Sequence, residues 1–223
     1  MTTVLAAVGL AREAKIAARA RLTPIIGAGN GQQLEKRLGW AIAKGAKGIV
    51  SFGIAGALAP LLRIGDVVIA THVVHGDEHY ATDPTWSGIL RERLPQAHSV
   101  VLAGHDRIVN HIDGKRRLFA LTGAHAVDME SHIAARLAAR HAIPFVALRT
   151  ISDVATKGLP PAALEPLKDS GKPRLTRILA SVAADPSQIP DLLATGRQAG
   201  KAFRALLRSR NALGLFLGCP YLG

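Results

Sequence analysis

Two acidic side chains stand where an α/β protein could use them for chemistry. Asp153 ends the apolar run Phe145–Asp153 (FVALRTISD), and a second acidic cluster at residues 127–131 (VDMES) lies one helix earlier. A carboxyl group at the end of a buried strand is held rigidly at the sheet edge where α/β proteins form their sites. Asp153 and Glu130 therefore predict a two-carboxylate site.

A basic residue interrupts the same apolar run. If Arg149 is buried, its guanidinium needs an acid beside it, because an unpaired buried charge costs several kcal/mol. Glu130 and Asp153 are the candidates for that partner. The alternative is an edge strand in which Arg149 faces water.

Two glycine-rich segments follow predicted strands. Gly27, Gly29 and Gly31 lack the G-x-G-x-x-G spacing of a dinucleotide loop. Residues 51–56 (SFGIAG) form the second segment. Glycines there would let a ligand approach the backbone, and a tight structural turn explains both segments equally well.

Three histidines and two acids lie close together between residues 72 and 79. They are His72, His75, Asp77, Glu78 and His79. Gly76 argues against a helix at this point, and no H-E-x-x-H spacing exists. The one cysteine, Cys219, cannot build a cysteine zinc site or an intramolecular disulfide, and favours a reducing cytoplasm. We expect no metal ion.

Short apolar strands alternate with helical stretches along most of the chain. We expect strands at residues 4–8, 23–26, 48–52, 67–74, 100–103 and 145–151, and helices at 10–21, 32–44 and 130–141. The strands are continuously apolar, which is typical of a sheet covered on both faces. Residues 75–95 are expected to form a loop with a short helix, and the proline-rich residues 156–173 an irregular lid. One domain over residues 1–223 is the simplest organisation.

The C-terminal part, from about residue 190, predicts a basic amphipathic helix. Its basic stripe is Arg197, Lys201, Arg204 and Arg208, and its apolar face is Ala199, Phe203, Leu206 and Leu207. One interpretation docks this helix on the core with its charges in water. The other is contact with a membrane surface.

The composition limits the classes of partner. The formal net charge is +12, yet only 4% of the residues are aromatic, so the mixture of basic and aromatic residues typical of nucleic-acid binding is missing. No apolar run reaches the roughly 18–20 residues that span a bilayer, and the N-terminus has no basic leader. We expect no nucleic-acid partner.

Three segments resemble, in content and order, the superfamily of purine nucleoside phosphorylases and methylthioadenosine/S-adenosylhomocysteine nucleosidases. They are residues 51–70 (SFGIAGALAPLLRIGDVVIA), 127–131 (VDMES) and 146–154 (VALRTISDV). The resemblance covers most of residues 1–155 and implies a three-layer α/β/α sandwich around a mixed sheet. The chain looks most like the hopanoid-associated branch, whose proteins are implicated in removing adenine from adenosylhopane, a nucleoside on a triterpenoid lipid.

The resemblance implies roles for particular residues. Asp153 corresponds to the acid that hydrogen-bonds or protonates the purine at N7, with Ser152 beside it. Glu130 corresponds to the carboxylate that grips the ribose hydroxyls, and Met129 to the side chain packed on the sugar. Glu13 lies one residue from the position of a glutamate that activates water in the nucleosidases.

Further residues follow from the same resemblance. Phe52 and Gly53 correspond to the strand end near the nucleoside, and Arg149 is grouped with them as a substrate-binding residue. Ile54 stands where phosphorylases commonly have a phosphate-binding serine, which disfavours phosphorolysis, although Arg12 could still serve phosphate. No organic cofactor is implied, and phosphate is the only co-substrate considered.

These features together predict cleavage of the N-glycosidic bond of an adenine nucleoside, with adenosylhopane as the preferred substrate. A homo-oligomer in the cytoplasm is expected, with peripheral contact to the inner membrane face through the C-terminal helix. The alternatives are a soluble methylthioadenosine or S-adenosylhomocysteine nucleosidase, and a non-catalytic nucleoside- or nucleic-acid-binding protein.

Overall fold

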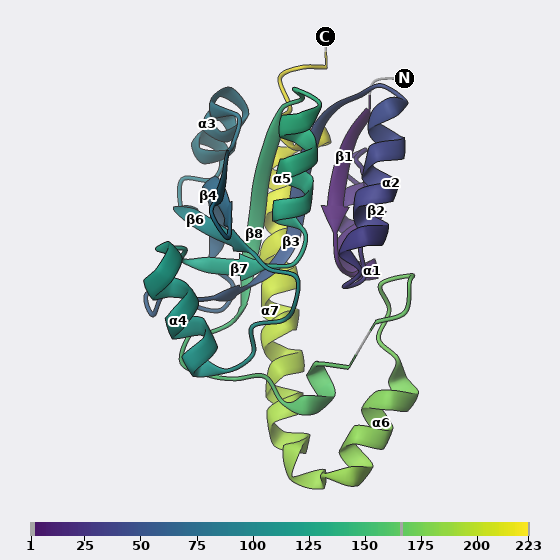
Figure 1. Cartoon of the computed structure of the whole chain (residues 1–223), viewed down its shortest axis with the longest axis vertical. Helices are drawn as coiled ribbons and strands as arrows, with labels where there is room; N and C mark the ends of the chain where they lie inside the picture. The colour runs from purple at the N-terminus through teal and green to yellow at the C-terminus, as the bar shows by residue number, and fades with distance from the viewer. Residues whose placement is uncertain (1–2, 166, 223) are drawn as a thin grey trace.

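The structure is a computed structural model that describes residues 3–165 and 167–222 (Figure 1). The strands are β1 (Thr3–Val8), β2 (Thr23–Ile26), β3 (Ala46–Ala57), β4 (Val67–His75), β5 (Glu78–Ala81), β6 (His98–Gly104), β7 (Ala126–Asp128) and β8 (Phe145–Asp153). The α-helices are α1 (Ala11–Ala18), α2 (Gly31–Ala43), α3 (Pro84–Arg93), α4 (Ile112–Thr122), α5 (Ser131–Arg140), α6 (Leu175–Ala184) and α7 (Ile189–Leu213). Short 3₁₀ helices cover Pro161–Ala163, Pro186–Gln188 and Leu215–Gly218.

The strands form one mixed sheet in the order β2-β1-β3-β7-β6-β4-β5, with β8 paired to both β3 and β4. Strand β8 runs parallel to β3 and antiparallel to β4. The pairings of β3, β8, β4, β6 and β7 therefore close into a ring. Because β8 lies inside this ring, it has no free edge and its side chains are almost all buried, which excludes the edge-strand alternative for Arg149.

Helices cover both faces of the sheet, which confirms the predicted three-layer sandwich (Figure 1). One apolar core contains Leu34, Leu38 and Leu137, which come from α2 and α5. The other contains Trp86 of α3 and Leu206 of α7, packed with residues of α1. Successive residues of β1 and β8 enter opposite cores, so these strands need apolar side chains on both faces.

Several elements differ from those expected. Strand β3 continues through the glycine-rich segment to Ala57 instead of ending near Phe52. Residues 75–95 contain strand β5, which pairs with β4 across a turn at Gly76 (φ 56°), before helix α3. Helices α4 and α6 and the three-residue strand β7 were not predicted.

Helix α7 joins the core along its second half and leaves it along its first. Phe203 and Leu206 are buried, and the carbonyl of Ala202 accepts a hydrogen bond from Thr150 Oγ1 of β8 at 3.1 Å. The four residues of the basic stripe are exposed, so the docked interpretation holds for this part of the helix. The first turns of α7 form with α6 a hairpin that projects beyond the sheet (Figure 1).

Candidate active site

Three carboxyl groups from distant parts of the chain line one cavity of about 560 Å³. Glu13 comes from α1, Glu130 from the residue before α5, and Asp153 from the end of β8. The two acids that the sequence analysis singled out therefore face the same space. Apolar side chains form much of the remaining wall: Ile108, Val109, Leu159, Leu164 and Leu167.

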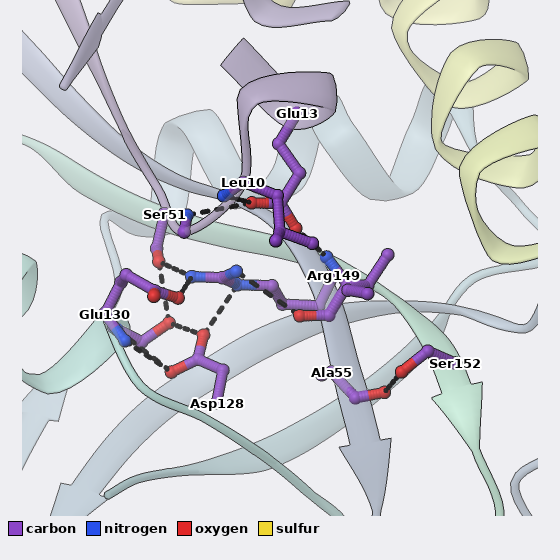
Figure 2. Close-up of polar contacts among 11 residues, drawn as sticks. Leu10, Glu13, Ser51, Ala55, Asp128, Glu130, Arg149 and Ser152 are labelled. Carbon is purple, nitrogen blue, oxygen red and sulfur yellow. Dashed lines mark hydrogen bonds and ion pairs between the residues drawn. The ribbon is translucent and has the colours of Figure 1, made fainter. Parts of the chain in front are cut away.

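The guanidinium of Arg149 joins the buried acidic side chains Asp128 and Glu130 (Figure 2). Its Nε lies 2.6 Å from Asp128 Oδ2, and its Nη2 lies 3.4 Å from Glu130 Oε2. Nη2 also donates to Ser51 Oγ, and Nη1 donates to the Ile54 carbonyl at 3.4 Å. The guanidinium is 1% exposed, so the predicted acid partner exists and Glu130 is one of two such partners.

Burial sets the protonation of Glu130. Removal from water raises the pKa of this carboxyl to about 8, with Asp128 and Glu13 adding to the rise and Arg149 opposing it. Burial therefore favours the protonated form of Glu130, and Arg149 favours the charged form. A protonated carboxyl donates one hydrogen bond and accepts others, which suits a pair of neighbouring hydroxyl groups.

Glu13 is fixed by the backbone around it (Figure 2). Its Oε2 accepts hydrogen bonds from the N–H groups of Gly9 and Leu10, both at 2.8 Å, and its Oε1 accepts one from Ile54 at 2.8 Å. Burial raises the pKa of Glu13, while Arg149 and these three donors lower it. The residue at the neighbouring position, Ala14, lies in the apolar core, so Glu13 is the side chain that reaches the cavity.

Asp153 makes an ion pair with a residue that the sequence analysis did not select. Lys115 Nζ lies 2.5 Å from Asp153 Oδ2 and also donates to the carbonyls of Val154 at 2.8 Å and Lys157 at 3.0 Å. On the other side, Ser152 Oγ lies 2.9 Å from Asp153 Oδ1. The lysine side chain is fully buried, so the carboxylate and its counter-ion form a fixed unit.

Not every predicted substrate-binding residue reaches the cavity. Met129 and Ser152 line it with Glu130. Phe52 does not, because its side chain points into the core between the sheet and helices α1 and α7. Gly53 does not form part of the cavity wall but leaves room for the Glu13 and Arg149 side chains. A Cβ at this position would lie 2.3 Å from Glu13 Oε1 and 2.7 Å from Arg149 Nη1. Arg149 pairs with Asp128 and Glu130, so its predicted part in substrate binding stays a prediction and would act through Glu130.

Other glycines permit the close approach of the acids. A Cβ at Gly9 would lie 2.6 Å from Glu130 Oε1, and one at Gly56 would lie 3.1 Å from Asp153 Oδ2. In the first glycine-rich segment, Gly29 lines the cavity beside Ala28 and has a φ of 78°. Both glycine-rich segments therefore help to shape the cavity, one through its backbone and the other by making room for carboxyl groups.

Residues 31–184 match the model of the phosphorylase superfamily, and the chain belongs to that superfamily. A 5'-methylthioadenosine/S-adenosylhomocysteine nucleosidase of Marinomonas sp. is 29% identical over 145 residues, covering 54% of this chain and 62% of the relative. The matched part therefore spans about six-tenths of that relative's length.

Solved structures show the same fold. Futalosine hydrolase of Helicobacter pylori superposes with a TM-score of 0.64 at 15% identity, covering 93% of this chain and 96% of that one. The 5'-methylthioadenosine/S-adenosylhomocysteine nucleosidase of the same organism, bound to butyl-thio-DADMe-Immucillin-A, gives 0.63 at 14% identity, covering 95% and 99%.

The ion pair between Lys115 and Asp153 leads to a first prediction. We expect Lys115→Met to lower the catalytic rate of this site at least tenfold, because a misplaced catalytic group loses rate steeply with small displacements. The substitution removes the ion pair with Asp153 and the two hydrogen bonds that anchor Lys115 to the carbonyls of Val154 and Lys157. The catalytic rate should be compared with that of Lys157→Met, which removes an exposed lysine paired with Asp191. Equal rates in the two variants would contradict a positioning role for Lys115.

Proposed function

We propose that this protein cleaves the N-glycosidic bond of an adenine nucleoside and releases adenine. The observation that carries the proposal is the convergence of Glu13, Glu130 and Asp153 on one cavity. Bond cleavage of this kind builds positive charge on the ribose and negative charge on the departing purine. Acids on both sides of that bond can stabilise the first charge and neutralise the second.

Each acid has a role that its surroundings support. Asp153 hydrogen-bonds or protonates N7 of the purine, and Ser152 with Lys115 fixes its orientation. Glu130 binds the ribose hydroxyls, with Met129 against the sugar. Glu13 orients and activates the attacking water, because its position in the cavity is set by three backbone donors.

Two contacts favour water over phosphate as the acceptor. The Ile54 N–H group, at the position where phosphorylases commonly present a serine, is already bonded to Glu13. The guanidinium of Arg12 lies over the ring of Phe203, 4.5 Å from its centroid, and Arg12 is absent from the cavity lining. Among the described residues that form the cavity wall, Arg107 is the one arginine.

The decisive experiment compares adenosine, methylthioadenosine and adenosylhopane, each with and without inorganic phosphate. We expect adenine and free ribose derivative from at least one substrate, at a rate independent of phosphate. A rate proportional to phosphate, with a ribose 1-phosphate product, would overturn hydrolysis. Absence of turnover on all three, with the nucleoside still bound, would instead favour the non-catalytic alternative.

We further propose adenosylhopane, a nucleoside of hopanoid biosynthesis, as the substrate, delivered to a homo-oligomer at the inner membrane face. The apolar wall of the cavity supports a substrate with an apolar 5′ substituent, and its residues Leu164 and Leu167 lie in the segment that leads to the α6–α7 hairpin. The hairpin exposes Leu175, Leu179, Ile189 and Leu193. Among the helices of residues 3–165 and 167–222, none has the combined length and hydropathy of a transmembrane span.

We propose the α6–α7 hairpin, rather than the basic stripe of α7, as the membrane contact. Because Phe203 and Leu206 are buried, the apolar face opposite the basic stripe is not free to enter lipid. Leu179 and Leu193 are 67% and 59% exposed, and Arg177 on the same hairpin offers positive charge to anionic headgroups.

We therefore predict that Leu179→Asp with Leu193→Asp weakens binding to anionic phospholipid vesicles by at least about tenfold, since burying one leucine contributes about 1.5–3 kcal/mol. Co-sedimentation with vesicles measures the effect. Leu121→Asp is the matched control, because that leucine is 78% exposed on α4. If all forms sediment equally, the membrane contact and its location on the hairpin are both refuted, while adenine release from a soluble nucleoside would stand.

A further inference from the structure

Two histidines from distant parts of the chain stack against each other beside the acid-lined cavity. His75 ends β4, and His132 lies in the first turn of α5. Their ring centroids are 4.3 Å apart, and the angle between the ring planes is 16°. In the sequence His75 belongs to the group at residues 72–79, whereas the fold brings it to a residue 57 positions away. Two protonated imidazoles in this arrangement would place two positive charges face to face, so the geometry limits how many protons the pair can hold.

Hydrogen bonds define one N–H group on each ring. His75 Nδ1 lies 3.0 Å from the carbonyl oxygen of Gly104, and His132 Nε2 lies 3.1 Å from Asp106 Oδ1. Carbonyl and carboxylate oxygens accept hydrogen bonds, so each of these two nitrogens is the donor. A neutral imidazole supplies one N–H group and therefore satisfies either contact. Any further proton on the pair must go to His75 Nε2 or to His132 Nδ1.

The surroundings of the two free nitrogens differ. His75 is partly exposed, whereas His132 is 1% exposed. Within residues 3–165 and 167–222, His132 Nδ1 has no hydrogen-bond partner. The backbone of Gly104 closes the space beside it, because a Cβ on that glycine would lie 2.5 Å from His132 Nδ1. A buried N–H group without an acceptor is costly, and so is a buried charge. A proton on His132 therefore does not fit the position that its ring occupies.

The titratable groups that act on the stack and on its carboxylate partner come from β4, β7, α5 and the segment after β6: His75, His105, Asp106, Asp128 and His132. Burial lowers the pKa of His132 and His75 lowers it further, while Asp128 and Asp106 raise it. The charge of Asp128 is already paired, because Arg149 Nε lies 2.6 Å from its Oδ2. The Asp106 side chain is 72% exposed, so water and salt screen its charge. Neither acid offsets the burial of His132.

Asp106 connects the stack to the cavity. It lines the cavity together with Arg107, Ile108 and Val109, which belong to the irregular segment between β6 and α4. The hydrogen bond from His132 ties this carboxylate, and with it the segment, to the start of α5. A turn of the His132 ring would break that bond and leave this part of the wall less firmly attached.

We infer that His75 and His132 form an acid-sensitive switch in the wall of the cavity. While His132 is neutral, the rings stack and Asp106 is held against α5. When His132 takes a proton, its ring turns to bring the new N–H group to an acceptor or to water. The stack then opens, and residues 105–110 lose their attachment. The inference concerns the wall and holds whichever reaction the cavity supports.

Chemical denaturation at a series of pH values tests the switch, with His132→Gln as the comparison. Glutamine can still donate a hydrogen bond to Asp106 but does not titrate. The pKa of His132 is lower in the folded chain than in the unfolded chain, where it is about 6.5. The unfolded state therefore takes up the proton first, and the parent chain loses stability as the pH falls below that value. Between pH 6.5 and pH 5 the unfolding constant of the parent should rise at least about threefold more than that of His132→Gln. Contributions from carboxyl groups are common to both chains and cancel in the comparison.

Two further measurements report on the stack and on the wall. In NMR titrations of the histidine rings, the midpoint of His132 should rise in His75→Gln, because that variant removes the facing imidazole while its amide can still bond Gly104. Amide hydrogen exchange of residues 105–110, corrected for its intrinsic pH dependence, should accelerate in the parent as His132 becomes protonated. The same segment in His132→Gln should show no such change.

His141→Gln is the matched control, because it makes the same chemical change at an exposed histidine at the end of α5. It should follow the parent chain in all three measurements. The inference is overturned if the unfolding constants of the parent and of His132→Gln keep a fixed ratio from pH 6.5 to pH 5. It is also overturned if exchange of residues 105–110 does not respond to protonation of His132. None of these readouts uses adenine release, so failure of the proposed function would leave them unchanged.

Discussion

Replacing Asp153 with asparagine should lower the rate of adenine release by about 10²–10⁴-fold, the usual contribution of a positioned general acid. Asparagine has nearly the same shape and can still bond Ser152 and accept from Lys115, so the substituted side chain should stay in place. It can donate a hydrogen bond toward N7 but, unlike a carboxyl group, cannot bind a proton and pass it on. The expected loss is therefore in kcat, with a smaller change in KM.

A coupled assay for adenine measures this effect, with Asp191→Asn as the matched control. Asp191 is an exposed acid paired with Lys157, and its loss should leave the rate unchanged. Circular dichroism should show the same fold in both variants. Unchanged turnover in Asp153→Asn would remove Asp153 from the chemistry, and with it the role of Lys115 as its positioning partner.

The sequence was a good guide where one short segment determines the outcome. Continuous apolarity in β1 and β8 predicted a sheet covered on both faces, and Asp153 was correctly placed at a strand end. The acidic residues 127–131 and the end of β8 were expected to meet, and both line the cavity. The β4–β5 hairpin was missed because its strand β5 is four residues long and largely exposed, so it carries little apolar signal.

Features that depend on distant residues could not be predicted in the same way. Lys115 is the one buried residue of helix α4. A single lysine in a sequence gives no sign that its side chain will be buried. Phe52 was predicted to lie near the nucleoside because it is next to the site in sequence. Side chains of a strand alternate between the two faces of the sheet, and that of Phe52 points into the core that contains residues of α1 and α7. Gly53 does lie at the site, but a glycine is needed there because the side chains of Glu13 and Arg149 occupy the space that a Cβ would take.

The surroundings of Arg149 predict the largest effect on stability. We expect Arg149→Leu to lower the free energy of unfolding by about 3–5 kcal/mol, the cost of leaving buried charges without their partner. For a domain of this size that corresponds to a fall in Tm of roughly 6–20 °C. Asp128 and Glu130 would lose their shared cation, and Ser51 and Ile54 a donor. Thermal unfolding followed by circular dichroism measures the change.

The pH dependence and a surface control separate this effect from simple loss of packing. Arg149 opposes the rise in the pKa of Glu130, which is about 8 in the intact chain, so its removal raises that pKa further. A carboxyl group whose pKa is higher in the folded than in the unfolded state stabilises the folded state at low pH. That contribution to the free energy of unfolding is lost as the pH rises through the pKa of the folded state. The Tm deficit of Arg149→Leu should therefore be larger at pH 9 than at pH 6.

Arg116→Leu breaks an exposed pair with Asp113 and should shift stability by less than about 0.5 kcal/mol. A deficit that is equal for both arginines, or independent of pH, would show that Arg149 does not neutralise the buried acids.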